Sequence, residues 1–174
     1  MIPQDWVTQV DSKGDFVRWV SRAQADNLRL MHRSVVVLIY NQHNQLLVQQ
    51  RSNQKKTQPL HWDTSVSGFV DYEDHPNGDP QAAQEAFYNA AHRELKEELG
   101  VSCKLTKLAE YSPCKNVHIE QMAVFLGFFD GSFSFDPLEV SAISWINEAS
   151  WGAIHPKTKQ LEWLYEKGIL WSNM

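Results

Sequence analysis

Residues 91–101 read Ala91-His92-Arg93-Glu94-Leu95-Lys96-Glu97-Glu98-Leu99-Gly100-Val101, and this stretch predicts the end of a helix. Asp79 is a good N-cap and Pro80 suits the first helical position, so we expect the helix to begin near Asp79. Gly100 suits the position just after the last turn. The intervening residues are mainly Ala, Gln, Glu, Leu and Lys, which are strong helix formers.

Three glutamates of this helix, Glu94, Glu97 and Glu98, fall within an arc of about 100° when the residues are placed on a helical wheel. Apolar residues of the earlier turns share this arc, so the carboxylates interrupt the inward face. Carboxylates held together and partly out of water repel one another unless a cation lies among them. The pattern favours a Mg²⁺ or Mn²⁺ site over a solvated helix end, because Lys96 points away and Arg93 lies beside Glu97.

The same residues resemble a known family motif. Glu85, seven residues, Arg93-Glu94-Leu95, one residue, Glu97-Glu98, one residue and Gly100-Val101 are similar to the Nudix box. The second half matches the family pattern at every fixed position. The resemblance implies a Nudix-type α/β/α sandwich around a mixed β-sheet, and divalent-metal chemistry on a diphosphate substrate. It also implies metal ligation by Glu94, Glu97 and Glu98, with Arg93 orienting these acids.

The first half of the motif departs from the family pattern. Gly78 stands one residue too far from Glu85, and Gly68 is the better counterpart of the family's glycine. Its backbone carbonyl is then a further candidate metal ligand. An insertion, residues 71–78, separates Gly68 from the helix, so Glu73 or Asp74 is predicted to take the place of Glu85.

Composition indicates an ordinary globular protein. The chain has 174 residues, of which 43% are hydrophobic and 21% charged, and we expect one domain spanning residues 1–174. The net charge of -5 provides no excess of positive charge of the kind that tight binding to duplex nucleic acid requires. No apolar run reaches the length of a membrane span, and residues 1–6 lack a signal-peptide pattern. Cys103 and Cys114 suit reduced thiols in a cytoplasmic protein.

Strand and helix signals follow one another along the chain. Residues 6–20 predict a hairpin with Gly14 in its turn, and residues 21–30 a short helix capped by Ser21. The run 34–40 predicts a strand buried on both faces. Further strands are predicted at 46–51, 64–70, 103–108, 116–129 and 140–146, and a last helix at about 157–167. This order of elements also indicates an α/β/α sandwich, with the box region at 68–101.

A basic, polar loop follows the strand at 46–51. Its basic residues are Arg51, Lys55 and Lys56. They are either surface charges that keep the protein soluble or cations that bind a diphosphate, Arg51 through a bidentate guanidinium and the lysines through single ammonium charges. Trp62 either stacks on a base or completes the core, and we favour the core. His32 and Arg33 are expected to be structural.

Two further acids are candidate site residues. Glu120 interrupts an apolar strand, so it is either the base that deprotonates water or an edge-strand charge. The resemblance to the family favours the base. Glu139 follows the long strand, in a stretch that resembles a Nudix substrate loop, and is either a site acid or a turn charge.

Three functions fit these residues. The favoured one is Mg²⁺-dependent hydrolysis of a diphosphate linkage in a nucleoside diphosphate derivative or related small molecule, with Glu98 or Glu120 as base. The second is isomerisation of isopentenyl diphosphate, whose Nudix branch this chain resembles. That branch needs a cysteine and a histidine where this chain has Ser67 and Phe69, which argues against it. The third is a non-catalytic nucleotide-binding Nudix domain.

Tryptophans near the two ends of the sequence leave the oligomeric state open. They either support a homodimer or complete a core: Trp6, Trp19, Trp163 and Trp171.

Overall fold

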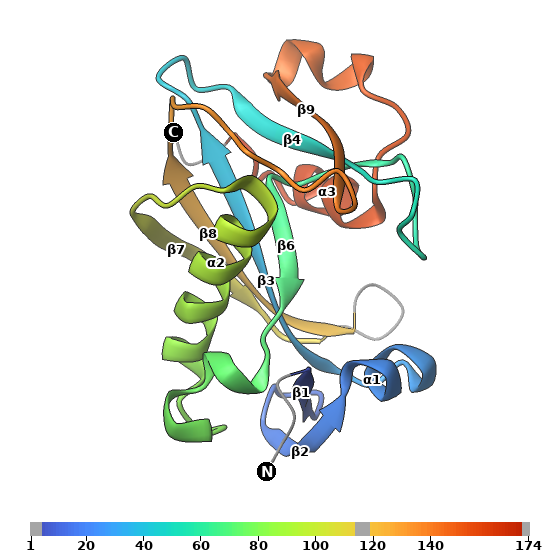
Figure 1. Cartoon of the computed structure of the whole chain (residues 1–174), viewed down its shortest axis with the longest axis vertical. Coiled ribbons are helices and arrows are strands. Elements are labelled where there is room, and N and C mark those ends of the chain that lie inside the picture. The colour runs from blue at the N-terminus through green and yellow to red at the C-terminus, as the bar shows by residue number, and fades with distance from the viewer. Residues whose placement is uncertain (1–4, 114–118, 172–174) are drawn as a thin grey trace. The chain divides into compact units, whose positions relative to one another are not determined.

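The computed structural model describes residues 5–113 and 119–171 (Figure 1). These residues form two compact units that interleave along the sequence. The first unit contains the described parts of 1–36, 67–93 and 107–125. The second contains those of 37–66, 94–106 and 126–174. Cys114 and the predicted beginning of the strand at 116 lie outside the described residues. The single domain predicted for residues 1–174 stays a prediction.

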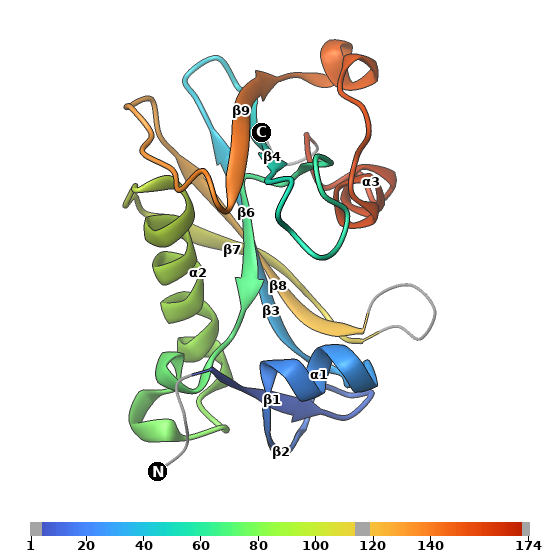
Figure 2. The ribbon, with the colours of Figure 1, turned by 45° about the vertical axis from the view of Figure 1, so that its right-hand side comes forward.

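The first unit begins with a hairpin and a short helix, as the sequence predicted. Strands β1 (Trp6–Val10) and β2 (Phe16–Ser21) are antiparallel, and helix α1 (Arg22–Leu28) lies against both (Figure 2). Ser21 caps α1 through a capping box with Gln24. Gly14 has φ +89, and a Cβ there would lie 2.7 Å from Gln121 Cδ, so this turn requires glycine.

A large β-sheet dominates the architecture, which is mixed α/β. Strand β3 (His32–Tyr40) pairs with β1, β4, β6 and β8, and all nine of its residues are buried, as its apolar run predicted. The other strands are β4 (Leu46–Arg51), β5 (Trp62–Asp63), β6 (Val66–Phe69), β7 (Leu105–Tyr111), β8 (Glu120–Phe128) and β9 (Val140–Ile146).

In the second unit, β4 lies between β9 and β5. Its antiparallel register with β9 runs from Leu46 opposite Ile146 to Arg51 opposite Val140 (Figure 1). Helix α3 (Lys159–Glu166) begins after Thr158, whose hydroxyl accepts a hydrogen bond from the Leu161 amide at 3.2 Å. A 3₁₀ segment, η3 (Glu148–Ala153), precedes α3 and was not predicted.

Helix α2 (Ala83–Leu99) begins four residues later than predicted. The inserted segment forms two 3₁₀ turns, η1 (Tyr72–Asp74) and η2 (Pro76–Gly78). Asp79 ends η2, and its carboxylate accepts a hydrogen bond from the Gln81 amide at 2.9 Å. Asp79 therefore caps a separate turn rather than the helix.

The end of α2 is at the predicted place. Gly100 has φ +69, and its amide donates to the Lys96 carbonyl at 3.0 Å. The apolar side of α2 is fully buried; its largest residues are Phe87, Leu95 and Leu99. No helix within 5–113 or 119–171 is long and apolar enough to cross a membrane.

Candidate metal and substrate site

The last two turns of α2 bring two carboxylates into the interior. Glu94 and Glu98 are each only 7% exposed, although most glutamates lie on the surface. Glu97 is exposed. It stands at the edge of the arc that the three acids share, so the helical wheel overestimated its burial.

The environment of Glu98 disfavours its charged form. Burial, and then the neighbouring charge of Glu94, raise the pKa of Glu98 to about 8. Two contributions act in the opposite direction: a hydrogen bond from Gln49 Nε2 to Glu98 Oε2 at 2.8 Å, and the charge of Lys55. These two contributions are smaller than those of burial and of the Glu94 charge, so the protonated form of Glu98 is favoured.

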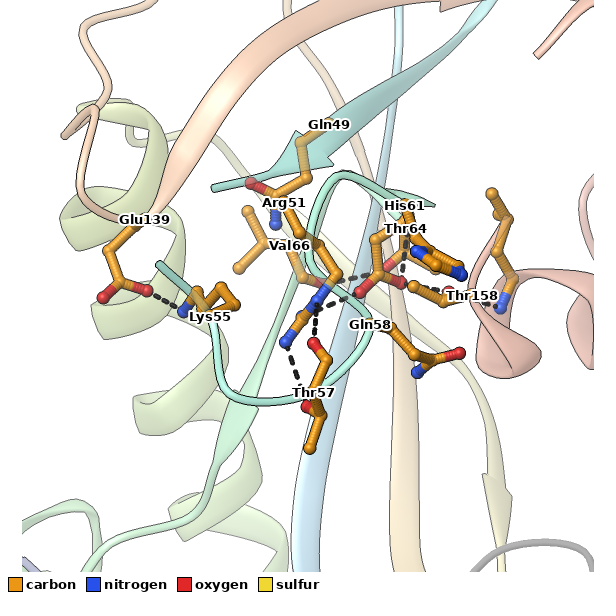
Figure 3. A network of polar contacts seen from close by, with 12 residues as sticks. Gln49, Arg51, Lys55, Thr57, Gln58, His61, Thr64, Val66, Glu139 and Thr158 are labelled. Carbon is orange, nitrogen blue, oxygen red and sulfur yellow. Dashed lines mark hydrogen bonds and ion pairs between the residues drawn. The ribbon is translucent and has the colours of Figure 1, made fainter. Parts of the chain in front are cut away.

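Lys55 is a basic residue whose charge acts on this pair. It forms an ion pair with Glu139, the residue just before β9, and lies on the loop after β4 (Figure 3). Burial lowers the pKa of Lys55, while the charges of Glu98 and Glu94 raise it. The sequence analysis considered Lys55 and Glu139 separately, and the structure joins them in one ion pair.

Arg51 organises the loop that carries Lys55. Its Nη1 donates to Asp63 Oδ2 at 3.1 Å, and its Nε donates to the Thr57 carbonyl at 3.2 Å (Figure 3). The other oxygen of Asp63 accepts a hydrogen bond from Thr158 Oγ1 at 2.8 Å. The guanidinium is thus engaged with protein groups on two sides, and its predicted contact with a diphosphate stays a prediction.

Trp62 lies on β5, half-buried, at the end of the same loop. Its amide donates to the Pro156 carbonyl at 2.7 Å, and its carbonyl accepts from the Thr158 amide at 2.8 Å. These bonds join the loop to the segment that precedes α3. These bonds involve the backbone alone, so the role of the Trp62 ring, which either completes the core or stacks on a base, stays a prediction.

Arg93 holds the inserted segment in the first unit. Its Nε and Nη2 donate to the two carboxylate oxygens of Asp74 at 3.0 and 2.8 Å, and Nη2 also donates to the Phe69 carbonyl at 3.0 Å. Asp71 lies 3.4 Å from Arg93 Nη2 and accepts a hydrogen bond from Arg22 Nε at 2.9 Å. Of the two acids that the sequence offered in place of Glu85, Asp74 rather than Glu73 is therefore the one that accepts hydrogen bonds from Arg93.

The remaining predicted acids have different surroundings. Glu73 and Glu85 are exposed, and Glu120 is half-buried at the beginning of β8. None of the roles assigned to these residues is tested by their positions alone. Lys56, the other lysine of the loop, is exposed.

Gly68 lies on β6 between Ser67 and Phe69. The Phe69 ring stacks on the buried His32 ring, with centroids 4.6 Å apart, and His32 Nδ1 lies 2.8 Å from the Leu30 carbonyl. Arg33 is also buried and donates to Gln121 and to the Pro80 carbonyl. His32 and Arg33 therefore have structural partners, as the sequence analysis expected.

The donors of the acid pair fit a hard divalent cation. Two buried carboxylates that repel each other need a positive charge between or beside them, and oxygen ligands suit Mg²⁺ and Mn²⁺. Gln49 Nε2 contacts Glu98, and among the residues that the structure describes the buried Oε1 of Gln49 has no hydrogen-bond partner. No preformed group of three or more His, Cys, Asp or Glu ligands occurs within the described residues. Assignment of Glu94, Glu97, Glu98 and Gly68 as metal ligands stays a prediction.

Comparison with known proteins gives the class of the protein. A family model of the NUDIX domain matches residues 30–164. The chain is 31% identical over 132 residues to an isopentenyl-diphosphate delta-isomerase of Schizosaccharomyces pombe, covering 69% of this chain and 58% of that protein. It is 27% identical over 146 residues to the uncharacterized Nudix hydrolase YfcD of Escherichia coli K12, covering 82% and 73%.

Solved structures agree on the fold. The crystal structure of DR0079 from Deinococcus radiodurans superposes with a TM-score of 0.74 at 24% identity, covering 92% of this chain and 98% of that one. The chain belongs to the Nudix family, and its relatives include proteins named as isopentenyl-diphosphate isomerases and proteins named as Nudix hydrolases. The sequence resemblance is thereby confirmed, including the branch that resembles isopentenyl-diphosphate isomerases.

Proposed function

We propose that this protein is a Mg²⁺-dependent pyrophosphohydrolase that cleaves a diphosphate linkage in a nucleoside diphosphate derivative or a related small molecule. The observation that carries the proposal is the buried pair Glu94 and Glu98, in which burial, and then the charge of Glu94, raise the pKa of Glu98 to about 8. A protein that buries two adjacent acids gives up stability for them unless a cation is bound. Mn²⁺ suits the same ligands.

In this proposal Glu94 and Glu98 hold the cation, with Glu97 and the Gly68 carbonyl as further ligands. Bound Mg²⁺ supplies positive charge that offsets the phosphates and lowers the pKa of water. Glu98 is the first choice as general base, and Glu120 is the second. The base takes a proton from water, the water oxygen forms a bond to phosphorus, and the bridging P–O bond breaks to release a phosphate-bearing leaving group.

Lys55 is the residue that we assign to the substrate phosphates. Its ammonium already lies where the charges of Glu94 and Glu98 act on it, and it is only one quarter exposed. Arg51 keeps the loop in shape through Thr57 and Asp63, so it supports Lys55 whether or not it also touches phosphate.

Isomerisation of isopentenyl diphosphate is the second candidate, because the relative from Schizosaccharomyces pombe is named as such an isomerase. The resemblance requires a thiol and an imidazole on the glycine segment, and this chain has Ser67 and Phe69 there. A serine hydroxyl is a much weaker acid than a thiol, and Phe69 is engaged in stacking on His32. These residues favour the hydrolase.

The deciding experiment is a substrate panel followed by phosphorus NMR. It contains nucleoside diphosphates and triphosphates, sugar nucleotides, dinucleotide cofactors and isopentenyl diphosphate, each with Mg²⁺ or Mn²⁺. Release of a phosphate or monophosphate from one class supports the hydrolase and names its substrate group. An allylic product with an intact diphosphate would refute the hydrolase and support the isomerase. Shifts of the ligand signals without turnover would refute the hydrolase and support a nucleotide-binding domain.

Glu98→Gln tests the site itself. If Glu98 is both ligand and base, the substitution should lower Mg²⁺-dependent turnover by at least ~100-fold while the circular dichroism spectrum stays unchanged. Turnover equal to that of the wild type would refute the assignment.

We further propose a cytoplasmic location, because Cys103 is a free thiol. The homodimer suggested by the tryptophan-rich ends also stays a proposal. Sedimentation velocity would decide it.

A further inference from the structure

Gln49 is a buried polar residue that neither the sequence motif nor the family resemblance singles out. It lies on β4, two residues before Arg51, and is only 4% exposed (Figure 3). Its side-chain nitrogen donates to Glu98 Oε2 at 2.8 Å. Binding of a cation would favour the ionised carboxylate, which only accepts hydrogen bonds, so a donating amide nitrogen suits that state of Glu98.

The other end of the same amide lacks a partner in the described part of the chain. Gln49 Oε1 is buried and accepts no hydrogen bond from residues 5–113 or 119–171. Buried amide oxygens are almost always paired, and an unpaired one calls for an explanation. Because Oε1 and Nε2 share one carbon atom, the unpaired acceptor lies close to Glu98. An acceptor at that place suits a donor that arrives only when the site is occupied, and water is the smallest such donor.

We propose that Gln49 is a positioning residue of the hydrolytic site, which orients Glu98 through Nε2 and receives the attacking water through Oε1. This inference rests on the proposed hydrolase function. A neutral amide suits both tasks. It holds one carboxylate oxygen in place without supplying a positive charge that would compete with the cation, as a lysine or arginine would.

A purely structural role for Gln49 makes different predictions. In that case the side chain only fills space beneath α2, and any side chain of similar size and shape preserves the site. Gln49→Met tests this difference, because methionine has a similar length but neither donates nor accepts strongly. Gln50→Met is the matched control. Gln50 is the next residue of β4, and its amide nitrogen donates at 3.1 Å to the Leu60 carbonyl instead.

The first measurement is Mn²⁺ binding by electron paramagnetic resonance in the absence of substrate. We expect Gln49→Met to weaken Mn²⁺ binding by about 10-fold, since loss of a residue that orients a metal ligand has an effect of that order. Gln50→Met should bind Mn²⁺ as the wild type does. Wild-type affinity in Gln49→Met, with an unchanged melting temperature, would overturn the proposal.

The second measurement uses the substrate class found by the panel. Gln49→Met should lower kcat by about 10-fold or more and leave KM nearly unchanged, because Gln49 orients a ligand and a water rather than the substrate. An increase in KM alone would also overturn the proposal. If Gln49→Met does not fold, Gln49→Leu also removes both the donor and the acceptor without adding a charge, and we expect the same loss of kcat. Wild-type kcat in Gln49→Leu would contradict the proposal.

Failure of the inference and failure of the proposed function are distinguishable. If no diphosphate in the panel is hydrolysed by the wild type, the function is wrong. The Mn²⁺ measurement still decides whether Gln49 positions Glu98.

Discussion

Replacement of Glu98 by glutamine should stabilise the metal-free protein, and the gain should grow with pH. Burial and the charge of Glu94 raise the pKa of Glu98 from 4.5 to about 8 in the folded state. Unfolding restores the ordinary pKa, so the folded protein binds this proton more tightly than the unfolded chain does. The stability that the protonated form provides is therefore complete below pH 4.5 and is lost as pH rises towards 8.

The size of the effect follows from the pKa. Each pKa unit corresponds to about 1.4 kcal/mol, so full ionisation of Glu98 costs about 5 kcal/mol above pH 8 and almost nothing near pH 4.5. Glutamine has the same size and carries no charge. We therefore expect Glu98→Gln to raise the free energy of unfolding by up to about 5 kcal/mol near pH 9 and by less than about 1 kcal/mol near pH 5.

Urea unfolding in EDTA near pH 5, 7 and 9 measures this difference directly. Glu97→Gln is the control, because Glu97 is exposed on the same helix and its replacement should have little effect at any pH. A stability difference for Glu98→Gln that does not change with pH would refute the argument from the buried pair. Added Mg²⁺ should then stabilise the wild type near pH 9 more than Glu98→Gln, since it binds the folded state of the intact pair.

Two other substitutions test the parts that support the site, each by urea unfolding. Asp74→Ala should lower the free energy of unfolding by about 3 kcal/mol, because it leaves the Arg93 guanidinium, only 17% exposed, without its bidentate partner. The control is Glu73→Ala at the exposed neighbouring residue, which should change the free energy of unfolding by less than about 0.5 kcal/mol. Gly100→Ala should cost about 2 kcal/mol or more, because φ is +69 and the new Cβ would lie 2.6 Å from a backbone carbonyl oxygen. Gly152→Ala, with nothing within 4 Å, should be nearly neutral, and a loss equal to that of Gly100→Ala would contradict the steric argument.

Sequence reasoning succeeded where one local pattern decides the structure. The apolar run of β3 could only be a strand buried on both faces, and Gly100 was the obvious stop for a helix that needs a left-handed residue after its last turn. Helical periodicity also identified Glu94 and Glu98 as inward-facing. These predictions depend on short-range sterics and on periodicity, and both can be read from neighbouring residues in the sequence.

It failed where long-range contacts compete with a local signal. Asp79 looks like a helix cap, but its carboxylate caps the turn that follows the insertion. The sequence of the insertion could not distinguish Glu73 from Asp74 as the acid that takes the place of Glu85. In the structure, Asp74 is the one of the two that accepts hydrogen bonds from Arg93. Gln49 gave no signal, because a glutamine on a strand is typical of an exposed face, and its burial against Glu98 depends on a helix 49 residues further along the chain.

The contact between Arg22 and Asp71 bears on how this protein can be shortened. The family match begins at residue 30, so a fragment cut to that boundary would lack Arg22. Burial already raises the pKa of Asp71, and Arg22 is the strongest of the groups that counteract it. Without Arg22, Asp71 would keep Arg93 as its basic neighbour at 3.4 Å and would draw it away from Asp74. An expression fragment should therefore include α1 rather than begin at residue 30, where the family match begins.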